Sequence, residues 1–128
     1  MNDFLITPAV LLYNFRDPAL RLWALEDLKT RFPDLAVTSS IPRNVELNSL
    51  EAQKGVALLR LAEHLGVNPA ETVAFGDDLN DVNMLQAAGI GVAMANAGPE
   101  ARAAADRITD SCDESGVGRG ILRLLGEL

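Results

Sequence analysis

The sequence is poor in cysteine, in clustered basic residues and in long apolar runs. Cys112 is the one cysteine among 128 residues, so no internal disulfide can form and a cysteine-based zinc site has no partners. The eleven lysine and arginine residues are scattered and the net charge is −7, which argues against nucleic-acid binding because that affinity comes from clustered positive charge. A reducing cytoplasm fits this composition best.

The most apolar stretch, MNDFLITPAVLLYNF, lacks the features of a targeting or membrane segment. It has no basic region, it carries Asp3, and Pro8 interrupts it well before the roughly 20 apolar residues that a membrane span needs. We therefore expect neither a signal peptide nor a membrane helix. With 48 % hydrophobic and 23 % charged residues, the chain has the composition of a folded globular domain.

Residues 1 to about 47 predict a small unit of strand, helix and strand. The run from Pro8 to Phe15 is short and apolar, as in a strand. Asp17 and Pro18 supply an N-cap and a first helical residue, and large apolar residues then recur at helical spacing until Pro33. The segments LAVTSS and NVELNS follow as strand pieces separated by proline.

From Asn48 onward, helices alternate with apolar strands. Asn48 and Glu51 have the spacing of a capping box before a helix that ends at Gly66. TVAFG and IGVAM are apolar without alternation, as in parallel strands covered on both faces, and a helix over roughly residues 81–88 joins them. A helix after Pro99, a short strand near RIT and a final helix around GILRLLGEL follow. This order predicts an α/β fold with an open, Rossmann-like parallel sheet.

A cluster of acidic and amide residues follows the TVAFG strand. Asp77 comes where the strand ends, which is where ligands bind in such sheets, and Asn80 and Asp81 fall at the entry of the next helix. We expect the Asp77 and Asp81 carboxylates to face one point and to suit a hard cation such as Mg²⁺. Taken singly, Asp78, Asn80 and Asp81 are also ordinary helix-capping residues. The full string G-D-x-x-N-D favours the functional interpretation.

Three segments together resemble the C-terminal half of haloacid dehalogenase superfamily phosphatases of the Cof type, subfamily IIB, which carry a large α/β cap. They are EAQKGVALLRLAEHLGV, VAFGDDLNDVNMLQAAGIGVAMANA and ADRITDSCDESGVGRGI, and the likeness covers Asn48 to about Leu125. The resemblance implies a partial Rossmann-like core over residues 48–128 and a remnant of the α/β cap over residues 1–47. It also implies a Mg²⁺-dependent hydrolase of small phosphomonoesters, such as sugar phosphates.

The resemblance also implies roles for four residues. Lys54 matches a lysine that neutralises the phosphate and the nucleophilic carboxylate, although a lone lysine early in a helix is usually just solvated. Asp77 matches the metal-binding aspartate, and Asn80 matches the asparagine that contacts the phosphoryl group. Asp81 matches the second acid of that motif, which binds the metal directly or orients its waters.

Two further residues are candidates for a supporting role beside the site. Asp78 stands where a glycine is common in the family. We interpret it as a residue that supports the site without contacting the substrate or the metal. Asn96 follows the next strand and is expected either to line the site or simply to cap the helix that begins after Pro99.

One part of the family's pattern is absent from this sequence. The first motif, D-x-D-x-T/S, provides the aspartyl nucleophile and the acid that protonates the leaving group, and no D-x-D occurs in the chain. We therefore expect a C-terminal fragment that is inactive alone and that self-associates or is completed by an N-terminal segment carrying this motif. The alternative is a non-catalytic remnant or subunit that binds a partner chain through an open sheet edge.

Overall fold

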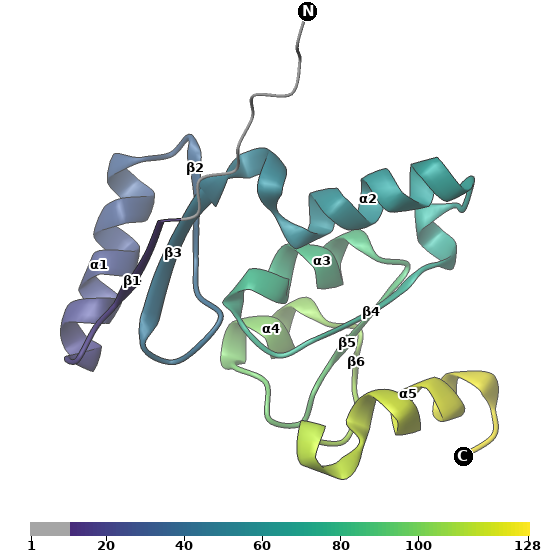
Figure 1. The fold of residues 1–128 in the computed structure, drawn as a ribbon. Helices are drawn as coiled ribbons and strands as arrows, with labels where there is room; N and C mark the ends of the chain where they lie inside the picture. The colour runs from purple at the N-terminus through teal and green to yellow at the C-terminus, as the bar shows by residue number, and fades with distance from the viewer. Residues whose placement is uncertain (1–10) are drawn as a thin grey trace, which may run out of the picture. The chain divides into compact units, whose positions relative to one another are not determined.

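The computed structural model describes residues 11–128, which form two compact units. The first unit ends at Gln53, and the second runs from Lys54 to Leu128 (Figure 1). The beginning of the predicted first strand, Pro8 to Val10, lies outside the described residues. The predicted identities of the two parts, cap remnant and core, remain predictions. No helix in the described range has the length and apolar character needed to cross a bilayer.

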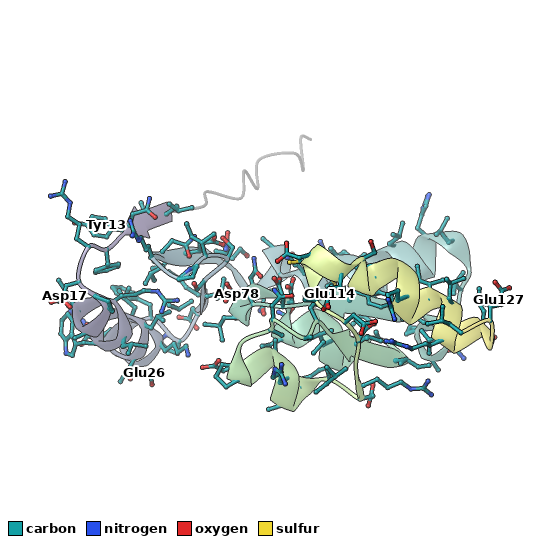
Figure 2. The ribbon with its side chains drawn as sticks, turned by 90° about the horizontal axis from the view of Figure 1, so that it is seen from below. Tyr13, Asp17, Glu26, Asp78, Glu114 and Glu127 are labelled. Atoms are coloured by element: carbon teal, nitrogen blue, oxygen red, sulfur yellow. The ribbon has the colours of Figure 1, made fainter. Side chains whose placement is uncertain are left out.

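The first unit is a three-stranded antiparallel sheet with one helix. The strands pair in the order β1-β3-β2. The elements are β1 (Leu11–Asn14), α1 (Pro18–Arg31), β2 (Leu35–Thr38) and β3 (Asn44–Ser49). Asp17, labelled in Figure 2, caps α1 because its carboxylate accepts a hydrogen bond from the Ala19 amide at 2.9 Å. The helix therefore starts where the Asp-Pro pair predicted it.

The turn between β2 and β3 is built around a buried asparagine. Asn44 is 1 % exposed, and its Oδ1 accepts hydrogen bonds from the amides of Ser40 (3.0 Å) and Ile41 (3.3 Å) and from the Ser39 hydroxyl (3.0 Å). Its Nδ2 donates to the Glu46 carboxylate at 2.8 Å. Both ends of this amide are therefore used inside the unit, which fixes the conformation of the turn.

The cap that follows β3 differs from the sequence prediction. Asn48 lies within the strand and pairs with Ala36, so it does not cap a helix. Ser49 takes that role, since its hydroxyl accepts from the Glu51 amide at 3.2 Å at the start of a 3₁₀ turn, Leu50–Ala52. The predicted capping box at Asn48 is wrong because this residue is paired within β3, whose bounds match the predicted strand piece NVELNS.

The second unit is an α/β fold whose sheet is parallel throughout. Its strands are β4 (Val73–Gly76), β5 (Ile90–Ala93) and β6 (Arg107–Ile108), in the order β4-β5-β6. Its helices are α2 (Lys54–Leu65), α3 (Val82–Ala87), α4 (Pro99–Ala104) and α5 (Gly116–Leu125). The predicted α/β class and parallel sheet are confirmed.

Helices cover both faces of this sheet. Ala74 of β4 packs in a core with Leu85 of α3 and Ala101 of α4. Its neighbour Phe75 points to the other face. There it lies so close to Gly120 of α5 that an added Cβ would be 2.7 Å from the ring. Figure 1 shows α3 and α5 on opposite sides of the strands. Within residues 11–128, β4 pairs with β5 alone, so its other edge is open.

Candidate active site

The candidate residues gather where β4 ends and α3 begins. Asp77 follows the last residue of β4, and a 3₁₀ turn, Leu79–Asp81, leads into α3. Asp78, labelled in Figure 2, caps this turn because its carboxylate accepts from the Leu79 amide at 2.7 Å. Asp78 therefore acts as the helix-capping residue that the sequence offered as an alternative, whereas Asn80 and Asp81 contact Lys54.

Asp81 is a buried carboxylate that organises the loop before it. Only 7 % of its side chain is exposed. Its Oδ1 forms an ion pair with the Lys54 amine, and its Oδ2 accepts hydrogen bonds from the amides of Asp77 (2.9 Å) and Asp78 (3.3 Å). Both carboxylate oxygens are thus engaged, and the loop is folded back onto the end of β4.

The charge state of Asp81 follows from these contacts. Burial alone would raise its pKa, because a low-dielectric environment disfavours the charged form. The hydrogen bond from Lys54, the two backbone hydrogen bonds and the positive charge of Lys54 outweigh burial and lower the pKa of Asp81 below its ordinary value. Asp81 is therefore ionised at neutral pH.

Lys54 brings a positive charge to the same place from a different element. It is the first residue of α2, and its amine donates to Asp81 and, at 3.4 Å, to Oδ1 of Asn80. The side chain remains 48 % exposed. The amine therefore has a buried anchor on one side and access to solvent on the other, so it can meet an anionic ligand.

Gly76 makes this arrangement possible. A Cβ at this position would lie 2.5 Å from the Cβ of Asp81 and 2.9 Å from its carboxyl carbon, closer than real atoms approach. The side chain of Asp81 therefore occupies the space that any larger residue at position 76 would need. Gly76, which precedes Asp77 in the motif, is therefore needed so that the side chain of Asp81 can pack against it.

Asp77 is exposed and is held from the loop that follows β5. Asn96 Nδ2 donates to Asp77 Oδ2 at 3.3 Å, and Asn96 Oδ1 accepts from the Cys112 amide at 3.0 Å. The Asp77 carbonyl accepts from the Gly98 amide at 2.9 Å. Asn96 thus connects segments that follow β4, β5 and β6, at the carboxyl ends of three adjacent strands.

The oxygen donors here suit a hard divalent cation bound with the help of water. Asp77 offers an exposed carboxylate, whereas the amide oxygen of Asn80 and both oxygens of Asp81 already accept hydrogen bonds. Mg²⁺ commonly uses one or two carboxylates and keeps several waters. Among the residues that the structure describes, no group of three or more His, Cys, Asp or Glu side chains could hold a metal. The Asp77 carboxylate fits Mg²⁺ as one protein ligand of a partial site that water would complete.

One contributor to this region was not predicted from the sequence. Oδ1 of Asn83, in α3, accepts a hydrogen bond from the amide of Gly55, in α2, at 3.0 Å. The two residues are 28 positions apart, and neither lies in a local sequence pattern that predicts the contact. Only the packing of α2 against α3 brings them together.

Comparison with known proteins gives one consistent family. The profile of haloacid dehalogenase-like hydrolases matches residues 9–121. The chain is 39 % identical over 109 residues to the 5-amino-6-(5-phospho-D-ribitylamino)uracil phosphatase YcsE of Bacillus subtilis, covering 85 % of this chain and 43 % of that protein. It is 49 % identical over 92 residues to phosphatase YwpJ of the same organism, covering 72 % of this chain and 32 % of the relative.

Solved structures agree with this result. A haloacid dehalogenase-like hydrolase from B. subtilis matches with a TM-score of 0.74 and 42 % identity, over 84 % of this chain and 38 % of that one. The subclass IIB sugar phosphatase BT4131 matches with a TM-score of 0.71 and 29 % identity, over 80 % and 39 %. The chain thus spans less than half the length of these relatives. The resemblance carried by the three sequence segments is confirmed.

Proposed function

Because the chain belongs to the haloacid dehalogenase-like hydrolase family, we propose that its second unit supplies the phosphate-neutralising and metal-binding part of a Mg²⁺-dependent phosphatase site. The observation that carries the proposal is the Lys54 amine, held by Asp81 beside Asn80 where β4 ends. Phosphoryl transfer depends mainly on positioning and on neutralising charge on the phosphoryl oxygens. Lys54 and Asn80 are the groups proposed to contact those oxygens.

We assign different tasks to the two aspartates that the sequence paired as metal ligands. Asp77 is the proposed direct ligand of Mg²⁺, because its carboxylate is exposed. Asp81 is the proposed holder of Lys54 and of the loop, because both its oxygens are engaged. When bound, Mg²⁺ supplies Lewis-acid neutralisation of the phosphoryl oxygens. Asn96 restrains the Asp77 carboxylate, and Asp78 stabilises the turn behind it.

The proposed substrate class is a small phosphomonoester. The relative YcsE is named for a phosphorylated ribitylamino compound, and BT4131 is described as a sugar phosphatase. These names support a phosphorylated metabolite, such as a sugar phosphate, as the substrate of the completed site. A cytoplasmic location is proposed with it, on the single cysteine of the chain.

The nucleophile must come from another segment, because the sequence has no D-x-D-x-T/S. The open edge of β4 is the proposed place for that segment. A strand that adds there would satisfy main-chain groups of β4, and it would cover apolar surface such as Val73, which is 42 % exposed. If the added strand is parallel to β4, like the rest of this sheet, its carboxyl end would lie beside Asp77. Pairing of two copies of the chain through this edge is the alternative arrangement.

The test is complementation of activity. The chain alone, with Mg²⁺, should hydrolyse p-nitrophenyl phosphate no faster than buffer. Adding a segment that carries D-x-D-x-T, encoded in the same frame upstream of Met1, should produce Mg²⁺-dependent turnover. Lys54→Ala should abolish that turnover, whereas Lys29→Ala, at the other lysine of the chain, should not.

Two results would contradict the proposal. Turnover by the chain alone that disappears in Asp77→Ala would mean that the site is completed in another way. A chain that sediments as a stable monomer, and that neither binds the added segment nor gains activity from it, would favour the non-catalytic remnant.

A further inference from the structure

We infer that Asn83 is a positioning residue for Lys54 and acts through the start of α2. The inference rests on the proposed function, since it concerns how the phosphate-binding amine is held. Asn83 Oδ1 accepts from the Gly55 amide at 3.0 Å in a partly buried contact. Gly55 directly follows Lys54, so this hydrogen bond fixes the backbone from which the Lys54 side chain extends.

The start of a helix needs such an acceptor. The first N–H groups of an α-helix have no partner within the helix, and a residue at its own N-terminus usually caps them. Here α2 begins at Lys54, and Asn83, in α3, supplies the acceptor for the Gly55 amide. A cap that comes from a second helix ties the position of α2 to that of α3.

The backbone packing around this cap is equally restrictive. A Cβ at Gly55 would lie 2.5 Å from the main-chain oxygen of Asn83 and 2.8 Å from its carbonyl carbon. Gly55 is buried and α2 meets α3 with no side chain between them at this point. The cap therefore operates across a close backbone contact in which a small shift would break the hydrogen bond.

The ion pair alone gives Lys54 a weak hold. A lysine reaches its partner through a flexible four-carbon chain, and the Lys54 side chain is 48 % exposed although Asp81 is buried. The Lys54 amine could therefore stay paired with Asp81 while its position relative to Asp77 changed. Fixing the amine beforehand lowers the entropic cost of binding a phosphoryl group. Two links from the start of α2 provide that fixation, Lys54 to Asp81 in the 3₁₀ turn and Gly55 to Asn83 in α3.

The chain offers a direct way to observe Lys54. It contains two lysines, so selective ¹³C,¹⁵N-lysine labelling gives two side-chain signals in NMR spectra. Lys29, in an exposed pair with Glu26, is the internal reference for a mobile lysine. Lys54, assigned by its loss in Lys54→Met, should show inequivalent ε-methylene protons and slower side-chain motion than Lys29.

A series at position 83 then tests the inference. In Asn83→Ala, amide exchange at Gly55 should accelerate about tenfold because that amide loses its acceptor, and Lys54 should become as mobile as Lys29. Asn83→Asp keeps the acceptor oxygen and should preserve both properties, and the shorter Asn83→Ser should lie between. The control is Asn68→Ala, which removes a cap of the same 3.0 Å length in the same unit and should leave Gly55 and Lys54 unchanged.

The two readouts must change together. Any folded variant in which the Gly55 amide exchanges rapidly while Lys54 stays immobile overturns the inference, as does a loosening of Lys54 in Asn68→Ala equal to that in Asn83→Ala. These measurements use the chain without Mg²⁺, phosphate or a second segment. Failed complementation would therefore count against the proposed function and leave the role of Asn83 to be judged by its own result.

Discussion

In each unit of the molecule, one buried polar side chain accepts hydrogen bonds from the backbone of a neighbouring turn and so fixes the conformation of that turn. In the first unit Asn44, 1 % exposed, accepts from the amides of Ser40 and Ile41. In the second unit the buried Asp81 accepts from two successive amides of the loop that precedes it. The local device is the same, a side-chain oxygen that satisfies two neighbouring backbone donors.

The difference lies in charge and in the third partner. Asn44 is neutral, and its amide group is used up by neighbours within its own turn and strand. Asp81 is ionised, and its counter-ion, Lys54, comes from a distant segment and keeps 48 % of its side chain exposed. Asp81 is therefore part of a candidate active site as well as of a turn, because the Lys54 side chain that balances its charge is also exposed to solvent.

The largest expected effect is at Asp81. Asp81→Ala should destabilise the second unit by about 2–4 kcal/mol, because two backbone donors and the Lys54 amine lose an ionised acceptor. Urea unfolding followed by circular dichroism, with hydrogen exchange at the Asp77 and Asp78 amides, measures the loss. Asp81→Asn keeps one acceptor oxygen and should lose less. Equal and small losses in the two variants would show that the charge is not what organises the loop.

A smaller effect is expected at Asn44. Asn44→Ala should destabilise the first unit by about 1–3 kcal/mol, because its neutral hydrogen bonds are buried. Faster hydrogen exchange should appear at the amides of Ser40 and Ile41, and exchange at Asp77 should stay unchanged. If Asn44→Ala cost more than Asp81→Ala, the comparison between the neutral and charged turns would be reversed.

The smallest effect concerns pH. A carboxyl group whose folded pKa is lowered contributes stability above its unfolded pKa, near 3.9, and this contribution is lost as pH falls through the folded pKa. Stability of the second unit should therefore fall in acid below about pH 4 more steeply in the wild type than in Asp81→Asn. Asn44→Ala should leave that slope unaltered. Unfolding curves at several pH values check this, and parallel wild-type and Asp81→Asn profiles would contradict it.

What the sequence predicted well has local causes. The Asp17-Pro18 pair specified the start of α1, and uninterrupted apolar runs specified β4 and β5 as covered parallel strands. The order of Lys54 and the G-D-x-x-N-D string led to the residues that the structure places together at the end of β4. Spacing along the chain carries this information, because the strand, turn and helix are consecutive.

What could not be predicted depends on contacts between distant segments. Asn48 falls both in the predicted strand piece NVELNS and in a predicted capping box, and only its pairing with Ala36 decides that it belongs to β3. The cap from Asn83 to Gly55 bridges helices that are separate in sequence. The engagement of both Asp81 oxygens, which shifts proposed metal binding towards Asp77, required the folded loop.

The position of Cys112 makes the site accessible to optical measurement. This single thiol is exposed, and the amide of its residue is joined through Asn96 to the carboxylate of Asp77. A maleimide dye would attach at one defined place without removal of any other cysteine. Because Asn96 contacts both the Cys112 amide and the Asp77 carboxylate, we expect a cation bound at Asp77 to change the surroundings of the dye. The native sequence thus already provides the attachment point for a fluorescent reporter of ligand binding.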